Sequence, residues 1–275
     1  LKKYGADILR IWVASSNYAE DLRIDYSILD QHAESYRKIR NTFRYLLGNL
    51  NDTYENNDLN KLEIDKLPEL EQLMLHKIYK LNLNFNKYFK NYDFHNLYKE
   101  LLNFCTVDLS AFYFDIRKDT LYCDPKNSQK RKSTLLLLNI ILNSLTRWFA
   151  PILSFTTEEI YQLISKDKKS IHLENFLDLP KKIENLEVEK KWKELIKIRD
   201  ICNISIEEKR SNKEIGSSLE AEIEIYTNKE TYKLLEGLDL AEYFITSKAE
   251  KFKSKNKDEL MIEVKKISGK KCPRC

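Results

Sequence analysis

The stretch YRKIRNTFRYLLGNL, residues 36–50, decides the fold. On a helical wheel its apolar side chains fall within about a third of the circumference, which is the pattern of a helix with one buried face: Tyr36, Ile39, Phe43, Leu46, Leu47 and Leu50. Arg37, Arg40 and Arg44 lie beside this stripe at the spacing i, i+3 and i+7. The stretch therefore predicts a helix that packs against other helices and carries a cationic face.

Helical periodicity continues over most of residues 28–180. A second helix follows Pro68, a third begins near Asp93 as its N-cap and carries apolar residues as far as Cys105, and a fourth runs from near Ser128 to Phe149. Long helices with short connections predict an up-and-down bundle.

A fifth helix is predicted from two local signals at its start. Thr156 and Glu159 have the spacing of a capping box, and Phe155 and Ile160 have that of a hydrophobic staple. Both signals place the helix start at residue 156.

The pattern changes after residue 180. One more helix is predicted over about residues 186–209, and the alternation AEIEIY at residues 221–226 predicts a half-buried strand. A short helix near residues 230–235 and two strands, at about residues 243–247 and 260–267, complete a small module. The predicted fold class is mainly α: a helical bundle followed by a small α+β module.

The composition excludes some classes of protein. With 42% hydrophobic residues and only 5 Gly and 5 Pro among 275, the chain reads as folded and helical. Lys and Arg exceed Asp and Glu by 47 − 43 = 4, so any cationic surface must be local. No apolar run is long enough to span a membrane, and the scattered Cys105, Cys123 and Cys202 suit reduced thiols in a cytoplasm.

Two groups of basic residues could bind phosphate. Arg37, Arg40 and Arg44 could follow an RNA backbone, because the guanidinium fork suits phosphate oxygens; the alternative is a solvated helix face with a few intrahelical ion pairs. Basic residues at a helix end that runs into a Gly-Ser turn form the second group: Lys209, Arg210 and Lys213. The alternative for this group is lysines that complement the helix dipole.

Cys272-Pro273-Arg274-Cys275 is the one motif typical of a metal site. A C-x-x-C turn places two thiolates on zinc, whereas a structural site requires four ligands, so Cys272 and Cys275 supply half a site. The sequence contains no Ser/His/Asp set, no paired-carboxylate signature and no glycine-rich phosphate loop.

Several segments resemble class I aminoacyl-tRNA synthetases of the isoleucine type. KYGADILRIWVASSNYAEDLRI (3–24) is similar to the segment after the catalytic signature loop of that family. Residues 36–50, YDFH (92–95) and RWFAPILSF (147–155) resemble landmarks of its anticodon-binding bundle. KEIGSSLEA (213–221) and KCPRC (271–275) are similar to its C-terminal junction and to the first half of its zinc knuckle.

The resemblance implies an organisation for the chain. Residues 1–27 would be the remnant of a stem-contact segment, 28–180 an anticodon-binding domain, 181–271 a junction module, and 272–275 half a zinc knuckle. On this interpretation both ends are cut, and Ile8, Trp12 and Val13 face a missing catalytic domain of the same polypeptide.

The resemblance also implies a function. The family attaches isoleucine to tRNA(Ile) with ATP and Mg, but the His-Ile-Gly-His-like and Lys-Met-Ser-Lys-Ser-like signatures are absent from this sequence. We therefore expect a monomeric, cytoplasmic tRNA-binding portion that holds the anticodon arm, binds neither ATP nor Mg, and has no activity alone. Two rivals stay open: a free-standing helical RNA-binding protein and a purely structural scaffold.

Overall fold

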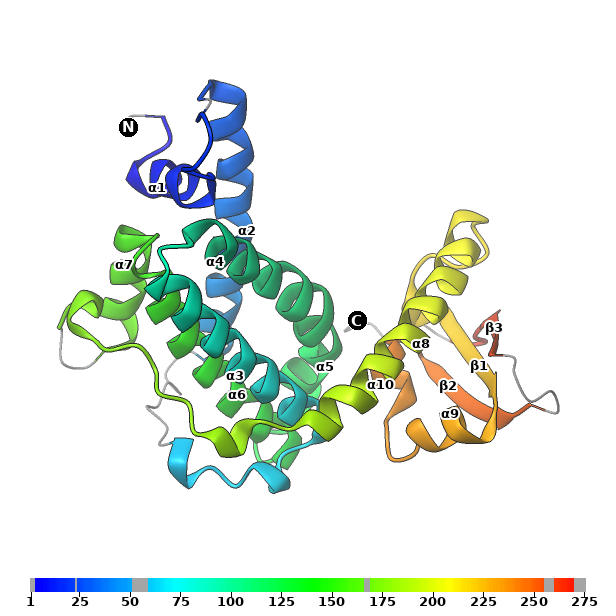
Figure 1. Ribbon diagram of the computed structural model, residues 1–275. Coiled ribbons are helices and arrows are strands. Elements are labelled where there is room, and N and C mark those ends of the chain that lie inside the picture. The colour runs from blue at the N-terminus through cyan, green and yellow to red at the C-terminus, as the bar shows by residue number, and fades with distance from the viewer. Residues whose placement is uncertain (1–2, 23, 51–58, 166–168, 255–259, 270–275) are drawn as a thin grey trace. The chain divides into compact units, whose positions relative to one another are not determined.

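The chain forms two compact units, Leu1–Asn185 and Leu186–Cys275. The computed structural model describes residues 3–22, 24–50, 59–165, 169–254 and 260–269 (Figure 1). The first unit is helical and the second combines helices with a three-stranded sheet, so the predicted fold class is confirmed. The division falls slightly after the boundary predicted at residues 180/181, and residues 1–27 are part of the first unit.

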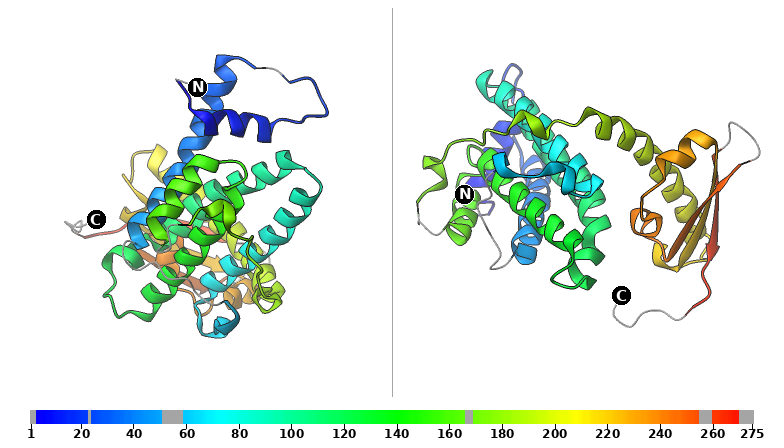
Figure 2. Two further views of the ribbon diagram at one scale, coloured as in Figure 1. Left: turned by 90° about the vertical axis from the view of Figure 1, so that its left-hand side faces the viewer. Right: turned by 90° about the horizontal axis from the view of Figure 1, so that it is seen from below.

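The first unit is a bundle of long helices with short helical turns in its connections. Its elements are α1 (Ala6–Ser15), α2 (Tyr26–Leu50), the 3₁₀ turns η2 (Leu59–Lys61) and η3 (Ile64–Lys66), α3 (Glu69–Lys90), α4 (Phe94–Asn103), η4 (Phe104–Phe114), α5 (Asp115–Cys123), α6 (Gln129–Phe149), α7 (Ser154–Ile164), η5 (Ile171–Leu173) and η6 (Lys181–Ile183). Figures 1 and 2 show α1 lying across the N-terminal end of α2.

The starts predicted for α4 and α6 are confirmed by their caps. The Asp93 carboxylate accepts from the Asn96 N–H at 3.2 Å, and the Ser128 hydroxyl accepts from the Arg131 N–H at 3.4 Å. Each bond satisfies one of the N–H groups that a helix start leaves without an intrahelical partner.

The continuous helical segment that starts at Asp93 is longer than predicted. It continues beyond Cys105 through η4, which is a π-helix, and ends with α5 at Cys123. Residues 104–114 are apolar on nearly every side, with Phe104, Leu109 and Tyr113 among those buried. A segment without a polar face lacks the 3.6-residue periodicity from which a helix is predicted.

A buried ion pair joins three helices of the bundle. Glu71 on α3 accepts two hydrogen bonds from Arg117 on α5, at 2.8 and 2.7 Å. The hydroxyls of Tyr113 (3.0 Å) and Thr134 on α6 (3.2 Å) also donate to it. Burial and the Glu71 charge raise the pKa of Tyr113 well above its ordinary value, so the phenol stays a neutral donor.

The predicted capping box and staple of α7 are wrong. No side chain of α7 itself caps its start; instead Asp7 on α1 accepts from the Thr156 N–H at 2.8 Å and from the Thr156 hydroxyl at 2.6 Å. Phe155 is 68% exposed and therefore does not form the staple with the buried Ile160. The cap comes from a helix 149 positions earlier in the chain, beyond the reach of a local pattern.

Helix α1 is fixed to the bundle by further contacts. Arg10 donates to the carbonyls of Ile152 (2.8 Å) and Pro151 (2.6 Å), and His95 on α4 donates to the carbonyl of Ser15. Ile8 is buried within this unit, so the expectation that it faces a missing domain is wrong. Trp12 is half-buried and Val13 is 58% exposed.

The second unit is built on one long helix and a mixed sheet. Its elements are α8 (Leu186–Ser211), η7 (Ser218–Glu220), β1 (Ala221–Thr227), α9 (Lys229–Leu234), α10 (Leu240–Phe244), β2 (Lys248–Lys253) and β3 (Met261–Lys266). The strand order is β2-β1-β3, with β2 parallel and β3 antiparallel to β1. The predicted alternation of β1 is confirmed, because every second side chain is buried.

The strand predicted at residues 243–247 is wrong. The Asp239 side chain accepts from the Glu242 N–H at 3.1 Å and starts α10, which continues to Phe244. Ile245 has a left-handed conformation (φ 56°) that ends the helix, and β2 begins only at Lys248. The lysines of β2 hide its strand character, and lysines are typical of edge strands.

Candidate nucleic-acid interface

The three arginines of α2 project from the bundle on one face. All three are exposed, whereas Ile39 and Phe43 on the same helix are buried in the core. Arg37 forms an ion pair with Glu34 one turn earlier. Within the described residues, Arg40 and Arg44 have no hydrogen bond or ion pair, so their guanidinium groups are available to an external anion.

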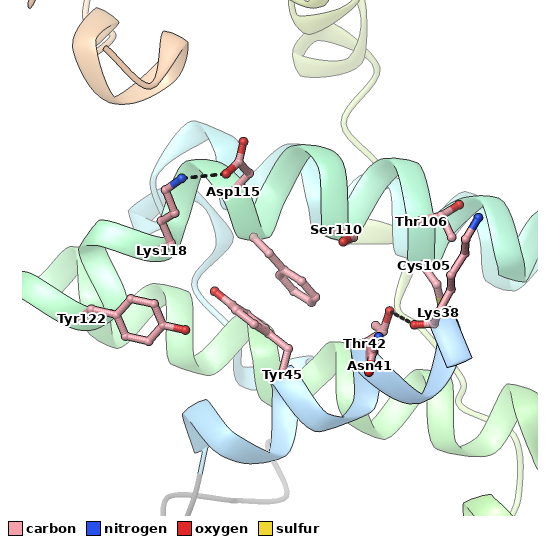
Figure 3. A pocket seen from close by; sticks show the side chains of 11 residues that line it. Lys38, Asn41, Thr42, Tyr45, Cys105, Thr106, Ser110, Asp115, Lys118 and Tyr122 are labelled. Carbon is pink, nitrogen blue, oxygen red and sulfur yellow. Dashed lines mark hydrogen bonds and ion pairs between the residues drawn. The ribbon is translucent and has the colours of Figure 1, made fainter. Parts of the chain in front are cut away.

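A groove of about 620 Å³ opens between α2 and the η4–α5 segment (Figure 3). Its wall on α2 is formed by Lys38, Asn41, Thr42 and Tyr45, and its opposite wall by side chains from η4 and α5: Cys105, Thr106, Ser110, Phe114, Asp115, Lys118 and Tyr122. Polar groups and aromatic rings therefore line one concave surface that is open to solvent.

An aromatic stack joins the two walls of the groove. The rings of Tyr45 and Phe114 lie 4.2 Å apart between centroids with an interplanar angle of 20°. Burial is the main cause, and the neighbouring Tyr122 the next, of a pKa of Tyr45 above its ordinary value. The Tyr45 hydroxyl is protonated at neutral pH. Lys118 forms an ion pair with Asp115 at the rim, at 2.9 Å.

The sequence did not predict the groove. On an ideal helix, Asn41 lies between the arginine face of α2 and the groove face that carries Lys38 and Tyr45. The spacing of these residues on α2 is readable, but the opposite wall comes from η4 and α5, which the sequence pattern did not predict. The groove and the arginine face are thus neighbouring surfaces of one helix.

The second predicted group of basic residues is partly neutralised. Lys209 pairs with Glu214 at 2.8 Å and Arg210 with Glu207 at 2.7 Å. Lys213 has a left-handed conformation (φ 60°) just after α8 and lines a shallow hollow of about 400 Å³ with Gly216 and Lys266. A helix C-terminus carries partial negative charge and does not favour phosphate. Lys213 has no ion pair within the described residues, which makes it the strongest candidate of this group.

The predicted zinc ligands Cys272 and Cys275 lie outside the described residues. Within the described ranges, no three His, Cys, Asp or Glu side chains gather as a metal site. Also within them, no helix is both long and apolar enough to cross a membrane. Cys105, Cys123 and Cys202 are free thiols.

Burial should protect two of these thiols from alkylation. It raises the pKa of Cys105 and Cys202 to about 12, so almost no thiolate forms at pH 8. We expect iodoacetamide at pH 8 to label the exposed Cys123 of the native protein, and to label Cys105 and Cys202 only in denaturant. Mass spectrometry of tryptic peptides checks this, and native labelling of Cys105 at the rate of Cys123 would contradict it.

Comparison with known protein families supports the RNA-binding interpretation. The family described as "Anticodon-binding domain of tRNA ligase" matches residues 71–225, from α3 into β1. The chain belongs to this family. The match includes η4 and α5, which form one wall of the groove, whereas the opposite wall on α2 lies before it.

Proteins named isoleucine–tRNA ligase are similar to the whole chain. The protein of Pelagibacter ubique is 68% identical over 275 residues, covering 100% of this chain and 30% of that protein. Those of Agrobacterium fabrum and Kosmotoga olearia are each 38% identical, over 284 and 283 residues, covering 100% and 99% of this chain. The chain spans about 30% of the length of these relatives.

Proposed function

We propose that this chain binds the anticodon arm of tRNA(Ile) and that α2 is the main RNA-binding element. It would serve an isoleucine–tRNA ligase, which attaches isoleucine to tRNA(Ile) with ATP. The observation that carries the proposal is the pair of exposed guanidinium groups on α2, Arg40 and Arg44, beside a groove with stacked aromatic rings. Family membership supports RNA as the ligand.

The two surfaces of α2 fit the two parts of a single-stranded loop. Arginine binds backbone phosphates through paired N–H groups, and an unstacked base enters a groove that offers polar groups and aromatic rings. Asn41 could hydrogen-bond the edge of such a base, since it stands between the arginines and the groove. Lys213 in the second unit would add a phosphate contact.

Removing either arginine should weaken RNA binding. We expect Arg40→Ala or Arg44→Ala to raise the Kd for tRNA(Ile) about fivefold, which is about 1 kcal/mol, and to make the salt dependence shallower. Arg37→Ala should have a smaller effect, because Glu34 already neutralises Arg37. Fluorescence anisotropy of labelled tRNA(Ile) between 50 and 200 mM salt measures both quantities.

Matched controls separate a contact from a general loss of charge. Lys190→Ala and Lys193→Ala remove exposed positive charges from α8 and should leave the Kd nearly unchanged. If the Arg40 and Arg44 variants keep both the parental Kd and the parental salt slope, α2 is not the RNA-binding element. Equal binding of an unrelated tRNA would argue for a general RNA-binding protein.

Catalysis would take place outside these residues. The two signature motifs of adenylation are absent from the sequence, so we expect isoleucine-dependent pyrophosphate exchange by this chain to stay at background. The intact ligase from the same source is the positive control. Exchange above background would contradict this part of the proposal.

The remaining partners follow from the same proposal. ATP and Mg would bind to a catalytic domain of the same polypeptide, and Cys272 and Cys275 would supply two thiolates of a zinc knuckle. Two thiolates alone hold zinc poorly, because a structural site uses four ligands. We also propose that the protein is monomeric and works in the cytoplasm, which the free Cys105 and Cys202 suit.

A further inference from the structure

The solvent face of α3 is basic. Residues 77–90 contain four lysines and no Asp or Glu: Lys77, Lys80, Lys87 and Lys90. Lys77 is paired with Asp108. Lys87 and Lys90 are exposed, and neither has a hydrogen bond or ion pair within the described residues. The last turn of α3 thus presents two uncommitted positive charges.

The turn that follows α3 contains a strained residue. Tyr92 has a left-handed conformation (φ 57°), its N–H donates to the Phe89 carbonyl (3.2 Å), and the next N–H, of Asp93, donates to the Tyr88 carbonyl (2.9 Å). This is the helix-ending turn in which glycine is usual, because a Cβ atom makes the left-handed conformation unfavourable. A tyrosine there costs about 1 kcal/mol or more.

Packing does not account for this tyrosine. Its ring touches Phe94 edge-on, with centroids 6.4 Å apart, and Tyr92 stays 69% exposed. The helix dipole accounts for lysines at the end of α3, but it does not favour an aromatic ring. Glycine would form the same turn with less strain.

The acidic groups near the turn are already engaged. The Asp93 carboxylate accepts from the N–H and the side-chain amide of Asn96, and Glu100 accepts from Asn84 and Tyr88. Neither carboxylate pairs with Lys87 or Lys90 within the described residues, although both keep their charge because their donors are neutral. Lys90 and Lys87 lie two and five residues before Tyr92 in the sequence. The surface therefore suits a polyanion that also offers a planar group.

We propose that Tyr92, Lys87 and Lys90 form a second RNA contact, separate from α2: the lysines bind backbone phosphates, and the ring stacks on an unpaired base. Aromatic rings flanked by cations are a common way of holding single-stranded RNA. This inference rests on the proposed function for its ligand. It adds a surface that neither the arginines nor the groove includes.

The proposed contact of Tyr92 is tested by a variant that affects stability and RNA binding differently. Tyr92→Gly should leave the melting temperature no lower than that of the parent, because it relieves the left-handed strain, yet it should raise the Kd for tRNA(Ile) about tenfold, through the lost stacking. Tyr92→Phe keeps the ring and should bind within about twofold of the parent. Circular dichroism melting and fluorescence anisotropy of the 275-residue chain measure the two effects.

The lysines need a charge-matched control. Lys87→Glu with Lys90→Glu should flatten the salt dependence and weaken binding more than Lys190→Glu with Lys193→Glu, the same change on exposed positions of α8. The inference is overturned if Tyr92→Gly binds tRNA(Ile) like the parent, or if the two lysine pairs behave alike. If Arg40→Ala and Arg44→Ala leave the Kd and the salt slope for tRNA(Ile) unchanged, that result contradicts the proposed function and not this inference.

Discussion

Replacing Glu71 by alanine is expected to lower the free energy of unfolding of the first unit by about 3–5 kcal/mol, the largest effect of any substitution considered for this chain. The change would remove the carboxylate that pairs with the buried Arg117 guanidinium and that accepts from the buried Tyr113 hydroxyl. Burying a charge without a partner is far more costly than burying a pair. Urea unfolding followed by circular dichroism measures the loss.

The same network makes a second variant informative. Glu71→Leu combined with Arg117→Met removes both charges, so the double variant should be more stable than either single one. Glu63→Ala, which breaks the exposed pair with Lys66, should have little measurable effect and serves as the control. A single Glu71→Ala variant within 1 kcal/mol of the parent would show that the pair is not buried as described.

Replacing Asp7 by alanine is expected to destabilise the chain by about 2 kcal/mol, because Asp7 supplies the side-chain cap of α7. Asp7→Asn keeps an acceptor oxygen and should lose about half as much. Amide hydrogen exchange localises the effect: the first turns of α7 should exchange faster, while α8 in the second unit should be unchanged.

Unchanged protection of α7 in Asp7→Ala would contradict this role. Ser154→Ala is a suitable comparison, because the one hydrogen bond of the Ser154 hydroxyl within the described residues goes to the Ala150 carbonyl in the preceding corner. Its effect should be smaller than that of Asp7→Ala. The comparison separates loss of the cap from general disturbance of the corner between α6 and α7.

Where a signal is local, the fold could be predicted from the sequence. The caps at Asp93 and Ser128 act on amides three residues away, and the alternation of β1 lies within seven consecutive residues. Each signal is complete in the segment that it describes. These elements were therefore predicted correctly.

The wrong or missing predictions arise where a partner is distant in the chain or where a segment lacks a clear pattern. The cap of α7 is Asp7, so the local pattern of Thr156 and Glu159 was misleading. The η4 helix is apolar on nearly every side and shows no clear helical periodicity, which hid half of the groove. The arginine face of α2 was readable because α2 has one buried and one exposed side, and the pair of Glu34 with Arg37 follows from their i, i+3 spacing.

The hydrogen bonds from α1 to the corner between α6 and α7 determine where a fragment containing the bundle has to begin. A polypeptide that begins at residue 28 would lose Asp7 and Arg10 together, and with them the partners of the Thr156 amide and of the carbonyls of Pro151 and Ile152. It would also uncover the surfaces of α2 and α4 against which α1 now packs. A fragment of the bundle that keeps these contacts therefore has to include α1 from Ala6 onward.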